Sequence, residues 1–170
     1  MKEEISFNFN MQMSYRYQNT DKIDKYIERA LQIKGNHHDA NVLMQNYLRG
    51  KFYDISNPSA LLDTINLLQN KYNSEGIGTL LMEEKLITYL KIANDLCDQK
   101  QISSADKYLQ DFETSCTLPI KNQMLEVQIE NTYRSMANYF YYKGNKLKSK
   151  SYVDRGLKYV PKSRVLESGF

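Results

Sequence analysis

Apolar residues recur along most of this chain with the spacing of an amphipathic helix. In the segment from Tyr133 to Pro161, apolar side chains first follow one another at three- and four-residue steps, which place them on one face of a helix. A Gly-Asn turn at Gly144 separates this pattern from a second helical pattern, which ends at Pro161. No part of the chain alternates strictly between apolar and polar residues, as a half-buried strand would. The pattern therefore predicts an all-α fold.

Prolines and capping residues divide the chain into consecutive helices. Pro58 and Pro119 lie where a helix should begin, and Pro161 lies where the last one should end. The glycines of the segment 76–78 are interpreted as a flexible link between the second and third helix pairs. The predicted helices span residues 4–18, 21–34, 38–54, 58–72, 79–99, 103–116, 119–143 and 146–160.

The helical pattern repeats along the chain. The segment that begins at Thr79 matches the segment 133–161 position by position, 44 residues earlier. If Ile23, Ala60, Ala105 and Ser149 are equivalent positions, the repeats are 37, 45 and 44 residues apart. Helix pairs at 4–34, 38–72, 79–116 and 119–160 and a tail at 161–170 then account for the whole sequence. At 170 residues the chain is long enough to bury one core, so we expect a single domain over residues 1–170.

The repeating unit resembles the tetratricopeptide repeat, a helix-turn-helix module. The residues on that family's signature sites are Tyr133, Met136, Ala137, Phe140, Gly144, Ser149, Val153, Gly156 and Pro161. The run from Tyr26 to Asn36 is similar to the end of a typical second helix. The resemblance implies helix pairs stacked as a right-handed superhelix. Because spacings near 44 residues exceed the usual length of about 34, other families of paired-helix repeats stay open.

The same resemblance implies a binding scaffold. In such an array the first helix of each pair lines a concave surface, so polar residues opposite the packed stripe are candidates for contact with a peptide. Carboxamides can hydrogen-bond an extended backbone, and arginine can hold a carboxylate with two parallel bonds. A solvated helix face is the alternative interpretation. The candidate peptide-binding residues on the concave face are Asn8, Gln12, Tyr15, Arg16, Asn41, Gln45, Arg49, Asn94, Asp98, Asn131, Arg134, Asn138 and Tyr141.

The end of the chain is basic. Residues 143–170 hold eight Lys and Arg against two acidic residues, a local net charge of +6, whereas the whole chain carries +3. A basic terminal helix could attract nucleic acid, with nearby tyrosines stacking on bases. A solvated outer helix explains the same residues, so nucleic acid is the less favoured partner. The basic residues are Lys143, Lys146, Lys148, Lys150, Arg155, Lys158, Lys162 and Arg164.

Histidine and cysteine positions do not predict a metal site. His37 and His38 lie at a predicted solvated turn and have no Cys or His partner at ligand spacing. Cys97 and Cys116 lack zinc-type spacing, and we expect free, buried or half-buried thiols that do not meet.

No pattern predicts catalysis either. The chain shows no order of Ser, His and Asp, or of Cys and His, that would indicate a nucleophilic mechanism. Carboxylate pairs without a histidine partner are interpreted as solvated acidic surface. We therefore expect no catalytic residues and no cofactor. These carboxylate pairs are Glu83–Glu84 and Glu126–Glu130.

Composition and chain ends suggest a soluble, cytoplasmic protein or a part of one. The chain is 41% hydrophobic and 25% charged, has no apolar run of membrane-spanning length, and begins with polar residues where a secretory signal would be apolar. A form processed from a longer precursor fits the sequence equally well. The apolar tail, with Val165, Leu166 and Phe170, either folds back as a cap or meets a partner. We therefore expect the chain to dimerise or to be one domain of a longer protein.

Taken together, these patterns predict a non-enzymatic scaffold that binds a protein or peptide on a concave face. The second hypothesis is a sensor or regulatory domain of a longer bacterial signalling or transcription regulator, by analogy with long-repeat, peptide-responsive regulators. The third is nucleic-acid binding through the basic C-terminal helix.

Overall fold

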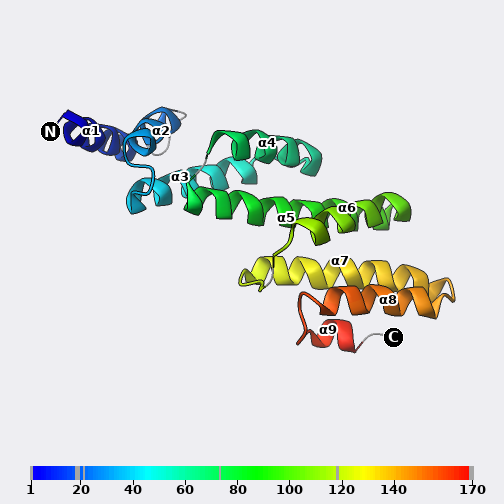
Figure 1. The fold of residues 1–170 in the computed structure, drawn as a ribbon. Helices are drawn as coiled ribbons and strands as arrows, with labels where there is room; N and C mark the ends of the chain where they lie inside the picture. Colours follow the sequence, from blue (N-terminus) through cyan, green and yellow to red (C-terminus); the bar gives the residue numbers. More distant parts are fainter. Residues whose placement is uncertain (1, 18–19, 21, 73, 118, 169–170) are drawn as a thin grey trace. The chain divides into compact units, whose positions relative to one another are not determined.

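The computed structural model describes residues 2–17, 20, 22–72, 74–117 and 119–168, and over these residues all regular secondary structure is helical (Figure 1). The all-α prediction is confirmed, and each predicted helix is present with shifted ends. A short final helix, α9, was not predicted. The helices are α1 (Lys2–Arg16), α2 (Ile23–Ile33), α3 (His38–Tyr53), α4 (Pro58–Lys71), α5 (Glu75–Asp98), α6 (Ile102–Ser115), α7 (Gln123–Tyr142), α8 (Lys146–Leu157) and α9 (Arg164–Glu167).

The chain forms two compact units, Met1–Met82 and Glu83–Phe170, which we call unit 1 and unit 2. Unit 1 contains the pairs α1–α2 and α3–α4, and unit 2 contains α6 and the pair α7–α8, with α9 after it. Helix α5 contributes its first turns to unit 1 and the rest to unit 2. The single domain expected from the chain length stays a prediction.

The core of unit 1 consists of the apolar stripes of its helices. Asn57 caps α4, because its side-chain oxygen accepts hydrogen bonds from the backbone of Ser59 and Ala60, and Pro58 occupies the first turn as predicted. These features fix where α4 begins and therefore which face it buries. The buried stripe residues are Ile23, Ile27, Met44, Leu48, Phe52, Leu61, Ile65, Ile77, Leu80 and Leu81.

The segment 76–78 is part of α5 and not a flexible link, so that prediction was wrong. Ile77 is fully buried in the core of unit 1. Gly76 lies close to α3, where the Gln45 side chain donates a hydrogen bond to the Gly76 carbonyl at 3.0 Å. A Cβ on Gly76 would lie 3.0 Å from Gln45 Nε2, so glycine permits this close approach. Glycine usually weakens a helix, but here burial of Ile77 and the contact with α3 outweigh that cost.

The core of unit 2 is formed by large side chains around small ones. Phe112 and Tyr133 are fully buried, with ring centroids 6.5 Å apart. The small residues predicted to allow close helix packing, Ala137, Ser149 and Gly156, are all buried as well. Close approach of α7 and α8 in unit 2 therefore follows from the spacing that the sequence showed.

Arg155 of α8 joins three helices of unit 2 through ion pairs and hydrogen bonds. Its Nη1 donates to Asp106 Oδ1 and its Nε donates to Glu113 Oε1 of α6, both at 2.8 Å. Tyr133 of α7 donates to the same Glu113 oxygen at 2.7 Å, and Tyr152 donates to Asp106 at 2.9 Å. Because every charged member has a partner, the network fixes α8 against α6 and α7.

The described part of the tail, residues 161–168, folds back onto unit 2, and Phe170 lies outside the described residues. Ser163 caps α9 by accepting a hydrogen bond from the Leu166 backbone at 3.2 Å, and Leu166 is only 1% exposed. Of the two outcomes expected for the tail, folding back as a cap is therefore the one present in this structure. Dimerisation and membership of a longer protein stay predictions.

Candidate peptide-binding surface

The predicted concave-face residues divide between the two units, and two of them in unit 1 form internal hydrogen bonds. Asn41 donates to the backbone oxygens of Gly35 and His37, at 3.1 and 2.9 Å, and accepts a hydrogen bond from Ser74. Gln45 donates to Gly76, as described above. Both amides therefore join α3 to the segments around it. In the sequence, Asn41 and Gln45 are simply polar residues beside the buried stripe of α3. That position fits an internal hydrogen bond and a ligand contact equally well.

The other predicted residues of unit 1 face solvent. Asn8, Gln12 and Tyr15 are exposed along α1, and Arg49 is exposed on α3. No hydrogen bond or ion pair is formed by the Arg49 guanidinium within the described part of the chain. These side chains stay candidates for ligand contact. Arg16, at the end of α1, is also exposed.

In unit 2 the predicted residues lie on two neighbouring helices. Helices α5 and α7 run side by side (Figure 1), and Thr132 Oγ1 of α7 lies 3.2 Å from the Leu90 carbonyl oxygen of α5. Asn94 is half-buried on α5, and its Oδ1 atom is buried without a hydrogen-bond partner among the described residues. An unsatisfied buried acceptor is costly and marks a place where a donor from outside could bind. Asp98 is exposed one turn further along α5.

The exposed side of α7 presents a continuous row of side chains, which we call the outer stripe: Met124, Val127, Asn131, Arg134 and Asn138. These positions alternate in steps of three and four, so they share one helix face. Met124 is 61% and Val127 is 44% exposed, whereas Asn138 is half-buried. Arg134 is exposed and forms no ion pair with any described residue. Tyr141 continues the row at the end of the helix and is half-buried.

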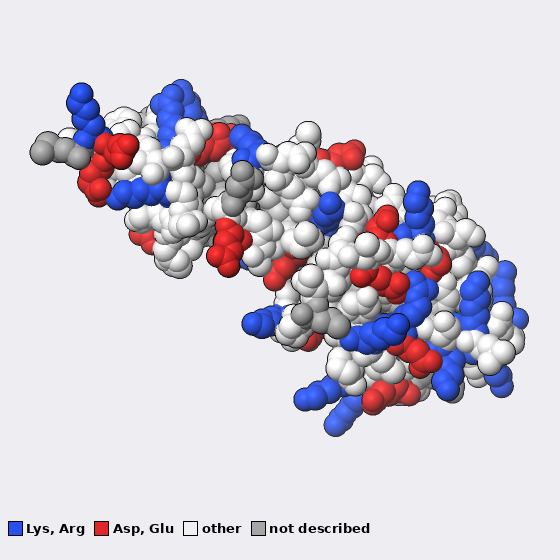
Figure 2. Space-filling view, in the orientation of Figure 1, with Lys and Arg blue, Asp and Glu red and all other residues white. Residues whose placement is uncertain are grey.

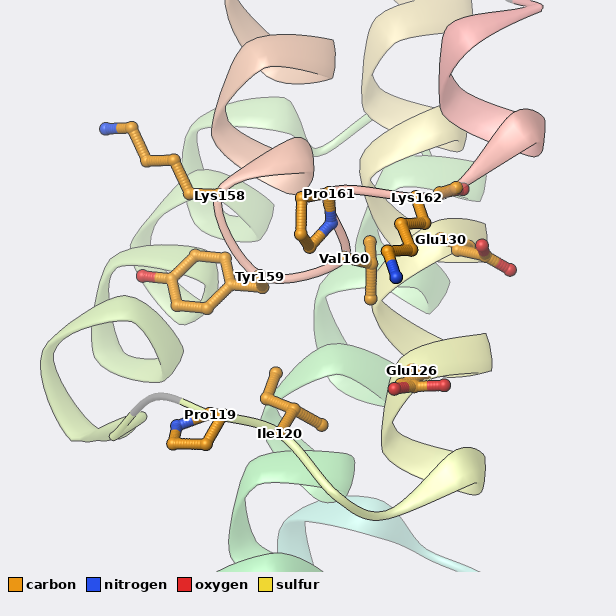
Figure 3. Close-up of a pocket in the computed structure, with 10 residues that line it drawn as sticks. Pro119, Ile120, Glu126, Glu130, Lys158, Tyr159, Val160, Pro161 and Lys162 are labelled. Carbon is orange, nitrogen blue, oxygen red and sulfur yellow. The ribbon is translucent and has the colours of Figure 1, made fainter.

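A cavity of about 470 Å³ lies beside the first half of α7 (Figure 3). The loop before α7, α7 itself and the loop between α8 and α9 form its walls. Ile120, Tyr159 and Val160 give it apolar surface, and burial raises the pKa of the Tyr159 phenol above its ordinary value. Pro119 and Pro161 complete the lining on the two loops.

Charged side chains stand at the edge of this cavity. Glu126 and Glu130 lie one turn apart on α7, and neither forms an ion pair with a described residue. Figure 3 shows Lys162 extending along the α7 wall toward Glu126, whereas Lys158 points away from the cavity. Like charges at this spacing repel one another, and the two carboxylates outnumber Lys162, the cation that extends toward them, so a further cationic group bound here would relieve the remaining repulsion. The cavity can therefore accept an apolar group with a positive charge beside it.

Sequence reasoning missed this cavity, since none of the predicted concave-face residues lines it. Its walls come from three segments that only folding brings together. In the sequence, Pro119 and Pro161 indicate only where helices begin and end, and Glu126 and Glu130 are interpreted as solvated surface. The available signal was a proline in each of the two loops, Pro119 and Pro161, with Tyr159 close to the second.

The described residues also border other hollows, among them one in each unit. A hollow of about 410 Å³ in unit 1 is bordered by Glu28, which pairs with Lys71 and accepts a hydrogen bond from Tyr72. A hollow of about 530 Å³ in unit 2 lies between the ends of α7, α8 and α9 and includes Tyr141. Arg155, one of the basic residues of the terminal helix, is held by two carboxylates and is therefore not available to a polyanion.

The histidines and cysteines have local structural roles. His37 is half-buried, with its ring centroid 4.5 Å from that of Phe7, and His38 is exposed but begins helix α3. The expectation of a solvated turn is therefore correct only for the exposure of His38. Burial raises the pKa of Cys97 to about 11, and both Cys97 and Cys116 are free, as predicted. Within the described ranges, no group of three or more His, Cys, Asp or Glu is placed to hold a metal ion.

Comparison with known proteins gives no relative. No family model matches the chain, and no similarity to a curated protein or to a solved structure was found. None of the helices in the described residues is long and apolar enough to cross a membrane.

Proposed function

We propose that this chain is a non-enzymatic binding module of the tetratricopeptide-like class, with helix pairs stacked as a right-handed superhelix, and that unit 2 holds a segment of another protein along α7. The observation that carries the proposal is that the outer stripe and the α7 residues of the cavity, Glu126 and Glu130, lie on neighbouring faces of one helix. Helix α7 forms the whole stripe and one wall of the cavity, and Glu126, Glu130 and Arg134 on it form no ion pair with a described residue.

The chemistry of this surface defines the segment that would fit it. The cavity has room and apolar surface for one large aliphatic or aromatic side chain, which would act as an anchor. Glu126 and Glu130 favour a Lys or Arg next to that anchor. The amides of Asn131 and Asn138 can bond the peptide backbone, and Arg134 can hold a carboxylate with two parallel hydrogen bonds.

The contrast between two arginines of unit 2 supports this assignment. Arg155 is half-buried and is held by Asp106 and Glu113, so its charge stabilises the fold. Arg134 is exposed, has no partner in the described residues, and stands between two amides on the outer stripe. A charge that contributes nothing to the fold is available for a ligand.

Selection of a random peptide library on the immobilised full chain tests the proposal. Selected peptides should share an apolar residue next to a Lys or Arg. In fluorescence anisotropy, Arg134→Ala combined with Asn138→Ala should weaken their binding at least about tenfold, because a hydrogen bond to a charged group contributes about 1.5–3 kcal/mol. Glu126→Gln combined with Glu130→Gln should weaken binding only of peptides that carry the basic residue.

The matched control is Arg29→Ala in α2, since Arg29 is also exposed and forms no ion pair with a described residue. This variant should bind peptides as the parent does. If the α7 variants and the Arg29 variant bind equally well, the surface on α7 is not the binding site and the proposal fails.

A further inference from the structure

The turn between α7 and α8 exposes two large apolar side chains. Tyr142 ends α7 and is 84% exposed, and Leu147 lies in the first turn of α8 and is 87% exposed. Gly144 makes the tight reversal between them with a positive φ of 77°. Neither side chain is used by the fold, although most of the apolar residues in the described part of α7 and α8 are buried or half-buried.

Lysines surround these apolar side chains. Lys143, Lys146, Lys148 and Lys150 are all exposed, and no acidic residue occurs between Lys143 and Val153. Figure 2 shows basic side chains gathered at the right of the view, where α7 turns into α8 in Figure 1. We call Tyr142, Lys143, Lys146, Leu147, Lys148 and Lys150 the basic tip.

The stability of α8 does not explain this arrangement. The N-terminus of a helix carries a partial positive charge and favours acidic side chains, yet the first turn of α8 holds none. Lys146, Lys148 and Lys150 instead place three positive charges near that end. Asn145 caps the helix by accepting a hydrogen bond from the Lys148 backbone at 3.1 Å. The lysines therefore interact unfavourably with the helix dipole, and helix stability does not account for their presence at this end of α8.

Contacts inside unit 2 leave these lysines unneutralised. Lys143 Nζ lies 4.7 Å from the centre of the Tyr139 ring, and Lys148 Nζ lies 4.5 Å from that of Phe140. Both contacts orient the ammonium groups without cancelling their charge. Lys146 and Lys150 line the hollow between α7, α8 and α9 together with Asp154 and Glu167, but no ion pair forms there among the described residues.

We propose that the basic tip binds the surface of a membrane that contains anionic phospholipids. A protruding turn that combines exposed aliphatic and aromatic side chains with lysines matches the boundary between acyl chains and charged headgroups. Leu147 enters the acyl region, Tyr142 lies at the headgroup level, and the ammonium groups contact lipid phosphates. Nucleic acid fits this surface less well, because leucine cannot stack on a base as an aromatic ring does. The inference is independent of the peptide site on α7.

Sedimentation with lipid vesicles tests the inference on the full chain. Vesicles of phosphatidylcholine with phosphatidylserine should bind the protein, and vesicles of phosphatidylcholine alone should not. Replacing the four lysines of the basic tip by glutamine should weaken binding by about fivefold per lysine. Leu147→Ala should weaken it at least about tenfold, because it removes acyl contact without changing charge. Added salt should weaken binding of the parent chain.

A charge-matched variant serves as the control. It replaces Lys25, Lys91, Lys107 and Lys121, which are exposed elsewhere on the chain, by glutamine and should bind vesicles almost as the parent does. Far-ultraviolet circular dichroism should show that every variant keeps its helix content. Equal binding to neutral and anionic vesicles, or no binding to either, would overturn the inference. So would binding to random oligonucleotides that Leu147→Ala leaves unchanged, together with no binding to vesicles.

Discussion

Gly156 shows how a single missing side chain sets the packing of unit 2. A Cβ at this position would lie 2.7 Å from Leu166 Cδ1 and 3.0 Å from Tyr133 Cβ, and both neighbours are buried. The sequence indicated a small residue here because Gly156 follows Ser149 at a spacing of seven. It could not indicate that the closest contact comes from the tail, since Leu166 is brought to Gly156 only by the turn after α8.

Gly156→Ala should therefore destabilise the chain, although alanine is the better helix former. We expect a loss of about 1–3 kcal/mol in the free energy of unfolding, the usual cost of overpacking a core, measured by urea denaturation. Gly50→Ala in α3 is the matched control, because no atom lies within 4 Å of the added Cβ. That variant should gain about 0.5–1 kcal/mol. A gain in both variants would mean that Leu166 and Tyr133 can move aside freely.

At the scale of the elements, the sequence predicted the helices, which depend on local residue spacing. It missed the contacts between segments that are far apart in the sequence. The α7–α8 pair followed from the spacing of its stripes and from Gly144. The two glycines of segment 76–78 indicated a link, because the contact of Gly76 with α3 is invisible in sequence. The amides Asn41 and Gln45 were interpreted as ligand contacts because exposed and internally bonded amides occupy the same helical positions. The cavity beside α7 was missed because two loops that are far apart in the sequence complete its walls.

The network of Arg155 joins elements and makes stability depend on pH. Burial alone would raise the pKa of Asp106, but hydrogen bonds from Arg155 and Tyr152 hold it below its ordinary value. The unfolded chain therefore binds a proton to Asp106 more readily than the folded chain does. The stability that this carboxylate contributes is present above its ordinary pKa of about 3.9 and is lost as the pH falls through the lower pKa of the folded state.

Arg155→Gln should remove about 1–3 kcal/mol of stability at neutral pH, because Asp106 and Glu113 remain half-buried without their cation. It should also reduce the further loss of stability below about pH 4, since Arg155 no longer helps to lower the pKa of Asp106 in the folded state. Urea denaturation at a series of pH values measures both effects. Arg164→Gln, an exposed change on α9, is the control. If the free energy of unfolding of Arg155→Gln falls below pH 4 as steeply as that of the parent chain, other carboxylates cause the acid dependence.

At the scale of the whole molecule, the division of the apolar core is the main feature. Unit 1 and unit 2 each bury their own cluster of side chains, around Ile65 in one and around Tyr133 in the other. If the proposed repeat architecture holds, contacts between neighbouring elements supply most of the stability, so a substitution in one unit need not unfold the other. Helix α5 has residues in both units, so unfolding of its first turns in unit 1 could extend along the same helix into unit 2.

Ile65→Ala should test how far the two units unfold independently. Ile65 is fully buried, so the change should cost about 2–5 kcal/mol. In hydrogen exchange followed by mass spectrometry, amides of α2, α3 and α4 should lose protection, whereas those of α7 and α8 should keep most of theirs. Leu67→Ala, at a position 72% exposed, should leave both units protected. Equal loss of protection in α4 and α7 after Ile65→Ala would instead show that the chain unfolds as one cooperative domain, as its length suggests.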